Sequence, residues 1–179
     1  VGADLYGISF ADANNGWILA RKASDGGGGR GGGGATGVIL KTSDGGKTWN
    51  EQASGPEYVM ADVSILDSQN VYMGGNGGAM FNTKDGGNQW IKKDSTIVWD
   101  ITSVSFADSV NGFASSSGGL LMRTNDGGTT WMKLTSYTSY DTKAIFAISS
   151  KKAWVVGNYG LILTTDDGGD TWNSQRCYS

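Results

Sequence analysis

Residues 119–131 read GLLMRTNDGGTTW, and this stretch decides the fold because the chain carries it four times. The other copies occupy residues 37–49, 78–90 and 160–172 and align without gaps. All four have the form Gly-x-x-x-x-Thr-x-Asp-Gly-Gly-x-x-Trp, which is an Asp-box hairpin. The Trp recurs every 41 residues, and so does the Asp. A register kept over so many positions indicates an internal repeat.

The sequence upstream of each box repeats as well. Its copies are ISFADANNGW (8–17), VSILDSQNVY (63–72), VSFADSVNGF (104–113) and IFAISSKKAW (145–154). The first repeat needs one insertion of 14 residues, which falls between Ala20 and Gly37. The sequence thus predicts one domain over residues 1–179, with a Gly-rich loop insertion at 21–36. The expected repeats span about residues 5–57, 58–98, 99–139 and 140–179.

Apolar residues within each repeat alternate with period two, as in strands. In the third repeat we expect strands at 101–107, 112–116, 120–124 and 130–134, separated by turns rich in Gly, Asn and Asp. Four short antiparallel strands of this kind make one propeller blade. The predicted fold class is therefore all-β: a β-propeller of four four-stranded blades without a helix longer than one turn. It is either a closed four-bladed ring or part of a larger propeller.

The residues of the Asp-boxes are interpreted as folding devices because they recur once in every repeat. The second Gly supplies a positive φ. The Asp accepts backbone N–H bonds from its own loop, and the Thr adds a hydroxyl. The Trp is an apolar cap packed under the hairpin or between blades. The predicted structural residues are Thr42, Asp44, Gly46, Trp49, Thr83, Asp85, Gly87, Trp90, Thr124, Asp126, Gly128, Trp131, Thr165, Asp167, Gly169 and Trp172.

The composition argues against several classes of function. The chain has no His, which removes the commonest general base and metal ligand. Cys177 is the only Cys, so no internal disulfide or Cys-based zinc site is expected. A net charge of −3 with few Arg gives no basic footprint for nucleic acid. We predict no cofactor, no metal and no catalytic residue, and no apolar run has the length of a transmembrane segment.

The repeat, with SFAD-x-x-NG before the box, resembles the photosystem II stability/assembly factor family of Asp-box (BNR-like) repeat proteins. The resemblance covers nearly the whole chain apart from residues 21–36. It implies a propeller with more than four blades and no enzymatic activity, located outside the cytoplasm or in a lumen. It also implies a protein that assists assembly of a membrane photosystem by binding its subunits.

A binding surface is expected on the face opposite the boxes. Since antiparallel strands alternate in direction, the boxes share a face with the turns between first and second strands. The other face carries the second-to-third-strand loops and the connections between blades. Loops on a rigid scaffold commonly carry recognition. The predicted partner-binding residues are Tyr58, Trp99, Tyr140, Tyr159, Arg21, Lys22 and Arg30. Packing between neighbouring blades is the alternative role for Tyr58, Trp99 and Tyr140.

We expect a non-enzymatic protein-binding scaffold whose partner is a membrane photosystem or another large assembly. The expected location is extracytoplasmic, either the thylakoid lumen or the secreted or cell-surface space. A secreted glycan-binding propeller is the alternative. A sialidase-type glycosidase is less favoured because it needs an arginine cluster and an acid. The arginines here are scattered, and the two glutamates, Glu51 and Glu57, lie close together on a linker.

Overall fold

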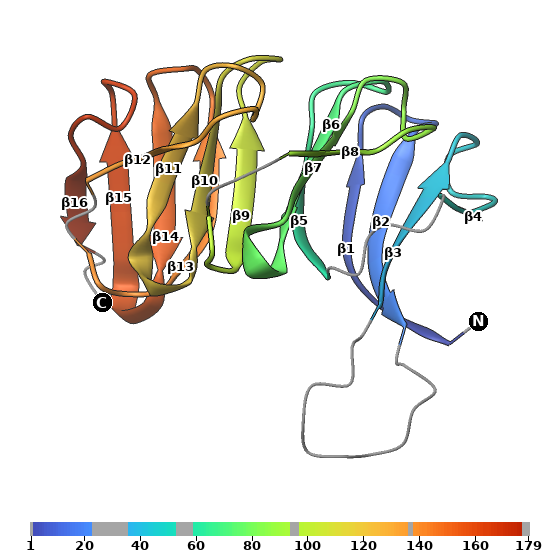
Figure 1. The fold of residues 1–179 in the computed structure, drawn as a ribbon, viewed down its shortest axis with the longest axis horizontal. Coiled ribbons are helices and arrows are strands. Elements are labelled where there is room, and N and C mark those ends of the chain that lie inside the picture. The colour runs from blue at the N-terminus through green and yellow to red at the C-terminus, as the bar shows by residue number, and fades with distance from the viewer. Residues whose placement is uncertain (1, 23–35, 53–58, 94–96, 136–137, 177–179) are drawn as a thin grey trace.

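The computed structural model describes residues 2–22, 36–52, 59–93, 97–135 and 138–176 of the chain (Figure 1). Within these ranges the strands form four antiparallel sheets of four strands each, and every sheet follows the order of the sequence. We call these sheets blades 1 to 4. The predicted all-β fold of four four-stranded blades is confirmed. The described helices are three 3-10 turns of three residues each, η1 (Asn76–Gly78), η2 (Ser117–Gly119) and η3 (Asn158–Gly160).

The strands of the first two blades correspond closely to the repeats. Blade 1 contains β1 (Ala3–Phe10), β2 (Gly16–Lys22), β3 (Thr36–Thr42) and β4 (Asn50–Glu51). Blade 2 contains β5 (Met60–Ile65), β6 (Val71–Gly75), β7 (Met80–Thr83) and β8 (Ile91–Lys93).

The other two blades repeat the same arrangement. Blade 3 contains β9 (Ile101–Phe106), β10 (Gly112–Ser116), β11 (Leu121–Thr124) and β12 (Met132–Lys133). Blade 4 contains β13 (Thr142–Ala147), β14 (Ala153–Gly157), β15 (Leu161–Thr165) and β16 (Asn173–Arg176). No helix in these described ranges has the length and apolar character needed to cross a bilayer.

The hydrophobic core lies in the three seams between neighbouring blades. Each seam contains one fully buried aromatic residue from a second strand: Trp17, Tyr72 or Phe113. Its partners are apolar residues of the following blade; the ring of Tyr72, for example, stacks on Phe106 with centroids 3.6 Å apart. Strands β6 and β10 are buried along their whole length because they are covered on both faces. The equivalent strand β14 is only partly buried, since the described residues form no further blade beside it.

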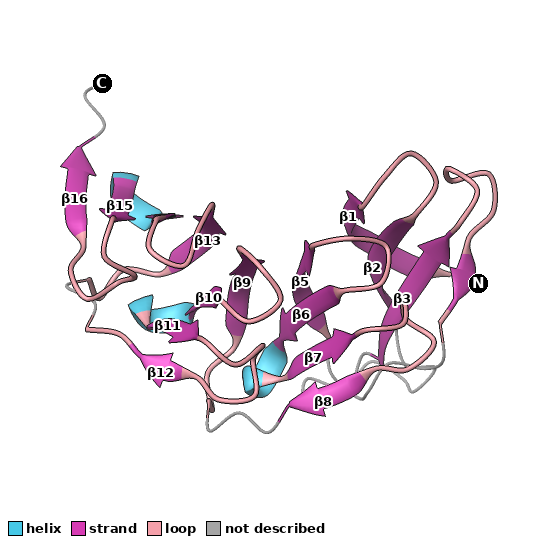
Figure 2. Cartoon of the chain, turned by 90° about the horizontal axis from the view of Figure 1, so that it is seen from above, coloured by secondary structure: helices cyan, strands magenta, loops and turns pink. Residues whose placement is uncertain are grey.

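The four blades form an open arc. Strands β1, β5, β9 and β13 line its inner side, while β8 and β12 lie on the outer side (Figure 2). Blades 1 and 4 lie at opposite ends of the molecule (Figure 1). The inner strands of blades 2 and 3, and those of blades 3 and 4, are joined by hydrogen bonds from a backbone N–H to a serine hydroxyl of the preceding blade. The Phe106 N–H donates to Ser64 Oγ at 2.8 Å and the Ala147 N–H to Ser105 Oγ at 3.0 Å.

The boxes and the first-to-second-strand turns share one face, as the strand order predicts. In every blade the first box glycine donates its N–H to a carbonyl of that turn. These bonds are Gly45 to Asn14, Gly86 to Gln69, Gly127 to Val110 and Gly168 to Lys151, at 2.8–3.0 Å. We call this side the box face. The opposite side, which carries η1, η2, η3 and the connections between blades, is the connector face.

Candidate functional site

The Asp-box carboxylates are engaged within their own hairpins. In blade 3 the Thr124 hydroxyl donates to Asp126 Oδ1 at 2.8 Å, and this oxygen also accepts the Thr130 N–H at 2.8 Å. The Thr124 hydroxyl in turn accepts the N–H of Gly128 at 3.0 Å. The same three bonds recur in the other three boxes. This closed set of contacts explains the recurrence of Thr, Asp and Gly on folding grounds.

The N–H groups bonded to the Thr and Asp side chains of the box differ from those expected from the sequence. That interpretation gave the buried N–H groups of the loop to the carboxylate. In the structure the N–H bonded to Asp126 belongs to Thr130 and is exposed, whereas the buried Gly128 N–H is bonded to Thr124. The hydroxyl therefore satisfies the buried donor. Both box glycines have a positive φ, at 70° for Gly127 and 79° for Gly128, although only the second was expected to need it.

Hydrogen bonding keeps the box carboxylates ionised. The Thr48 hydroxyl, the Thr48 N–H and the Thr42 hydroxyl lower the pKa of Asp44 to about 2. The pKa of Asp167 is lowered in the same way, first by the Thr171 hydroxyl. Every described carboxyl group with a resolved shift has a lowered pKa. A glycosidase acid needs the opposite, a raised pKa, so these groups are unsuited to proton donation.

The connector face carries three exposed aromatic residues. Trp99 is 56% exposed and Tyr159 is 87% exposed, and Tyr140 is also exposed. Since these rings are open to solvent, they do not fill the seams, which was the alternative role for Trp99 and Tyr140. The residues that follow them, Asp100 and Asp141, fix the connections in place. Asp100 Oδ1 accepts the Gly77 N–H at 2.7 Å, and Asp141 Oδ1 accepts the Gly118 N–H at 2.9 Å.

Tyr159 has an unusual backbone. It is the one non-glycine residue with positive φ in the described ranges, at 57°. The equivalent residues of blades 2 and 3 are Gly77 and Gly118, which adopt the same conformation without a side chain. A left-handed conformation is unfavourable for a bulky residue, and residues held in it are concentrated at functional sites. The Tyr159 ring lies 5.2 Å from that of Tyr140, so blade 4 has a pair of tyrosines beside its loop.

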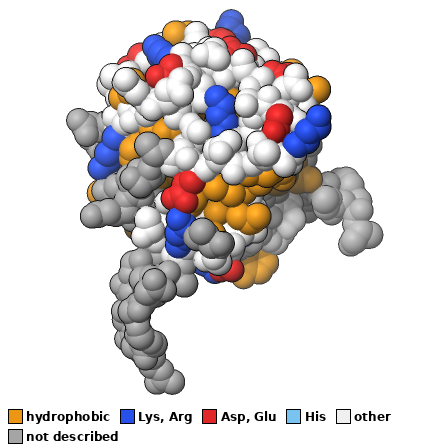
Figure 3. All heavy atoms as spheres, turned by 90° about the vertical axis from the view of Figure 1, so that its right-hand side faces the viewer, with side chains coloured by type: hydrophobic (Ala, Val, Ile, Leu, Met, Phe, Trp, Pro, Cys, Tyr) orange, Lys and Arg blue, Asp and Glu red, His pale blue; other side chains and the backbone are white. Residues whose placement is uncertain are grey.

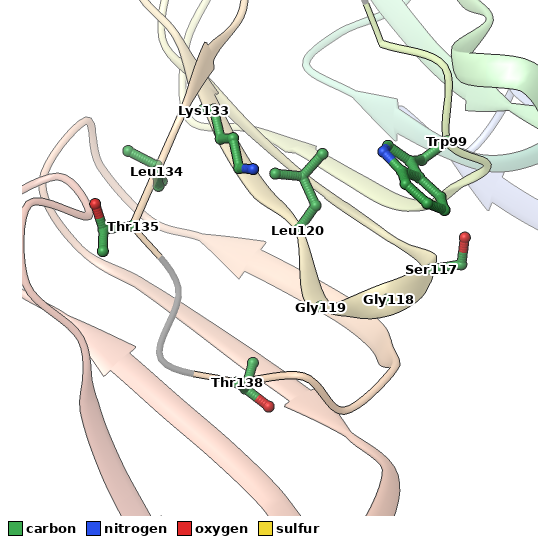
Figure 4. Close-up of a pocket in the computed structure, with 9 residues that line it drawn as sticks. All are labelled: Trp99, Ser117, Gly118, Gly119, Leu120, Lys133, Leu134, Thr135 and Thr138. Atoms are coloured by element: carbon green, nitrogen blue, oxygen red, sulfur yellow. The ribbon is translucent and has the colours of Figure 1, made fainter.

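Blade 3 has a hollow where blade 4 has this tyrosine pair. Gly118 stands in place of Tyr159, so blade 3 has no aromatic side chain at the loop position that Tyr159 occupies in blade 4. An open cavity of about 550 Å³ adjoins Trp99. In Figure 4, Trp99, Leu120 and Lys133 border it from three different segments. The described residues that line it are Trp99, Ser117, Gly118, Gly119, Leu120, Lys133, Leu134, Thr135 and Thr138. No carboxylate is among these nine described residues.

The basic residues predicted for this surface are not part of the cavity. Arg21 lies in blade 1 and pairs with Asp4 at 3.3 Å, and Lys22 pairs with Glu51 at 2.7 Å. Neither lines the space beside Trp99. Arg30 and Tyr58 fall outside the described residues. The structure thus brings together Tyr140 and Tyr159, with Trp99 one blade away, and leaves Arg21 and Lys22 apart from them.

Arg123 links two neighbouring blades through a hydrogen bond and an ion pair. Its Nη1 donates to the Gly168 carbonyl at 2.9 Å and pairs with Asp170 at 2.9 Å, which ties blade 3 to the box of blade 4. Lys41 makes the corresponding bond to the Gly86 carbonyl, at 2.6 Å, between blades 1 and 2. Among the described residues, no group of three or more Asp, Glu or Cys side chains is placed to hold a metal ion.

The four sheets, their seams and their boxes define the class: an Asp-box repeat protein of β-propeller type. A model of one family, described as photosynthesis system II assembly factor YCF48, matches residues 94–177, which cover blades 3 and 4. The resemblance to the photosystem II assembly factor-like family of Asp-box repeat propellers is therefore confirmed. A comparison with curated proteins gives no match.

Solved structures show the same fold. A structure of YCF48 bound to D1 peptide shares 16% identity with a TM-score of 0.60, over 97% of this chain and 81% of that one. A GH74 xyloglucanase from Xanthomonas campestris shares 15% identity with a TM-score of 0.71, over 96% of this chain and 30% of the enzyme. A GH74 enzyme from Niastella koreensis shares 19% identity with a TM-score of 0.65, over 95% and 30%. At these identities the likeness concerns the fold.

Proposed function

We propose that this chain is a non-enzymatic protein-binding module of the photosystem II assembly factor type. It holds a peptide segment of a membrane-complex subunit on its connector face, in an extracytoplasmic compartment such as the thylakoid lumen. The observation that carries this proposal is Trp99, an exposed indole beside an open cavity whose described lining residues include no carboxylate. The match of residues 94–177 to the assembly-factor family supports it, because these residues include Trp99, Tyr140 and Tyr159.

The chemistry of the surface suits a peptide. Trp and Tyr offer large rigid contact areas at low entropic cost, and such residues commonly anchor protein contacts. Leu120 adds apolar area, while Ser117 offers a hydroxyl for backbone groups. Lys133 is the one charged residue among the described lining residues, and its ammonium is a donor for a peptide carbonyl or carboxylate. YCF48, the relative of similar fold, is described as bound to D1 peptide.

Glycan binding is the second candidate, since exposed aromatic rings also stack on sugars. The fold likeness to two GH74 enzymes raises the same question. The two candidates are separated by titrating the chain with a D1 peptide and, in parallel, with a xyloglucan oligosaccharide. We expect saturable binding of the peptide, at least tenfold weaker in Trp99→Ala, and no binding of the oligosaccharide.

A matched control is Met132→Ala, which removes an exposed side chain of the same blade outside the cavity. It should bind the peptide like the unmodified chain. Saturable binding of the oligosaccharide that depends on Trp99, without peptide binding, would replace the proposal with the glycan-binding function. Binding of neither probe would contradict both.

A further inference from the structure

The exposed faces at the two ends of the arc correspond to the two faces that meet in each internal seam. Each blade has an outgoing face toward the following blade and an incoming face toward the preceding one. In the three internal seams these faces are buried against each other. Among the described residues, no blade covers the outgoing face of blade 4 or the incoming face of blade 1, and the two faces lie at opposite ends of the molecule (Figure 1).

Apolar residues remain exposed on the incoming face of blade 1. Ile8 is equivalent to Val104 in blade 3, yet it is 63% exposed whereas Val104 is 3% exposed. Phe10 is equivalent to Phe106, which is buried on Tyr72, yet Phe10 is exposed. Leu5 is exposed beside them. Figure 3 shows hydrophobic side chains gathered on this end of the molecule.

The outgoing face of blade 4 has the complementary set. Trp154 occupies the position of the buried seam residues Trp17, Tyr72 and Phe113, but it is only partly buried. Ile148 corresponds to Ala107, which packs into the seam between blades 3 and 4, and is 57% exposed. Phe146 and Val156 are exposed on the same blade.

A lysine lies near the Trp154 ring of blade 4, as another lies near Trp17 in the seam between blades 1 and 2, although the two lysines occupy different positions of the repeat. In the seam between blades 1 and 2, Lys41 Nζ lies 5.4 Å from the centre of the Trp17 ring and donates to a box carbonyl of the next blade. On blade 4, Lys152 Nζ lies 5.4 Å from the centre of the Trp154 ring and pairs with Asp166. The box of blade 1 carries the matching carbonyl at Gly45, which is equivalent to Gly86.

One position differs from the internal seams. The hydroxyls of Ser64 and Ser105 accept an N–H bond from the next blade, and blade 4 has Phe146 at this position. Because Phe146 has no hydroxyl, the outgoing face of blade 4 lacks this acceptor and presents an aromatic side chain in its place. Apolar residues are enriched at the cores of interfaces between identical chains.

From these observations we propose that the outgoing face of blade 4 docks onto the incoming face of blade 1 in a second copy of this chain. Trp154 of one copy lies against Phe10 of the other, as Tyr72 lies against Phe106 within the chain. The contact is head-to-tail, so it yields a closed ring of copies where the rotation closes and a longer row where it does not. The residues named for this contact do not line the cavity beside Trp99.

The test is light scattering on three forms of the chain over a range of concentrations. Ile8→Asp places a charge on the incoming face, and Ile148→Asp places one on the outgoing face. We expect the unmodified chain to reach at least twice the monomer mass of 18.7 kDa. Each variant alone should stay at the monomer mass, and an equal mixture of the two should regain association, because each variant keeps the face that the other lacks.

Folding of the variants is checked by thermal melting, and Ile8→Ser and Ile148→Ser replace any variant that does not fold. A monomeric unmodified chain at all concentrations would overturn the proposal. So would continued self-association of either variant by itself, which would indicate that identical faces pair with each other. Failure of the mixture to associate would overturn the head-to-tail arrangement.

Discussion

The box face and the connector face differ in what the four repeats hold constant. On the box face, the same Thr, Asp and Gly contacts recur in every blade at 2.7–3.0 Å. On the connector face, the position of Tyr159 is glycine in blades 2 and 3, and the position of Trp99 is Tyr140 one repeat later. Residues that recur in each blade stabilise the fold. The residues that vary, on an otherwise constant scaffold, are the ones available for recognition.

The largest effect should come from removing a tryptophan of the box face. Trp172 is 6% exposed and packs into the seam between blades 3 and 4 with Phe113 and Leu163. Trp172→Ala should lower the free energy of unfolding by about 3–5 kcal/mol, as expected for truncating a buried Trp. Urea unfolding measures this loss. A loss of unfolding free energy below about 1 kcal/mol would contradict the view that the recurring residues of the box face stabilise the fold.

Within a box, the hydroxyl should matter more than its exposed neighbours. Thr124→Val leaves the buried Gly128 N–H without its acceptor, which should cost about 1–3 kcal/mol. The matched control is Thr130→Val in the same hairpin, which removes an exposed hydroxyl that donates to Asp126 at 2.6 Å. The control should cost about 0.5 kcal/mol or less, as do most surface substitutions. An equal loss of unfolding free energy in the two variants would indicate that the Asp126 carboxylate, and not the Thr124 hydroxyl, is the main stabilising group of the box.

The box carboxylates also predict how stability depends on pH. Hydrogen bonds hold the pKa of Asp44 at about 2 in the folded chain, below its ordinary value of about 3.9. A lowered folded-state pKa gives a stabilisation that is fully present above about pH 4 and is lost as the pH falls toward about 2. Melting temperatures measured across this window should fall on acidification. Asp44→Asn should show a shallower fall, and an identical slope would mean that the box does not contribute.

The smallest change in stability should come from the strained tyrosine of the connector face. Tyr159→Gly relieves the positive φ of 57°, and the glycines of blades 2 and 3 already show that the loop forms without a side chain. Stability should be unchanged or rise by up to about 1 kcal/mol, because relief of the left-handed strain exceeds the entropic cost of glycine. Chemical unfolding tests this. A loss above 1 kcal/mol would place Tyr159 among the folding residues.

The fold was predictable from the sequence because its signals are local and repeated. The box fixes a hairpin, and period-two patterning fixes the strands on either side. In blade 3, for example, the expected strands at 101–107 and 112–116 appear as Ile101–Phe106 and Gly112–Ser116. The open ends were harder to foresee, because ring closure depends on how four sheets rotate relative to one another and not on any one hairpin.

The candidate site was predictable only in part. Strand order is enough to place Trp99, Tyr140 and Tyr159 on one face. The cavity beside Trp99 depends on Gly118 standing where blade 4 has Tyr159, a difference visible in the repeat alignment but without meaning until the loops are seen. The ion pairs that engage Arg21 and Lys22 follow from cross-strand neighbours in blade 1. From the sequence, these two basic side chains were expected to reach toward a partner, and the structure shows that they form ion pairs within blade 1.

The central claim is that Trp99 serves recognition and not folding, and one variant tests it most directly. Trp99→Ala should be measured for urea unfolding and for binding of a D1 peptide in the same preparation. Since the indole is 56% exposed, we expect the free energy of unfolding to stay within about 0.5 kcal/mol of the unmodified chain. Peptide binding should weaken at least tenfold. A destabilisation on the scale of Trp172→Ala, with peptide binding unchanged, would contradict the account.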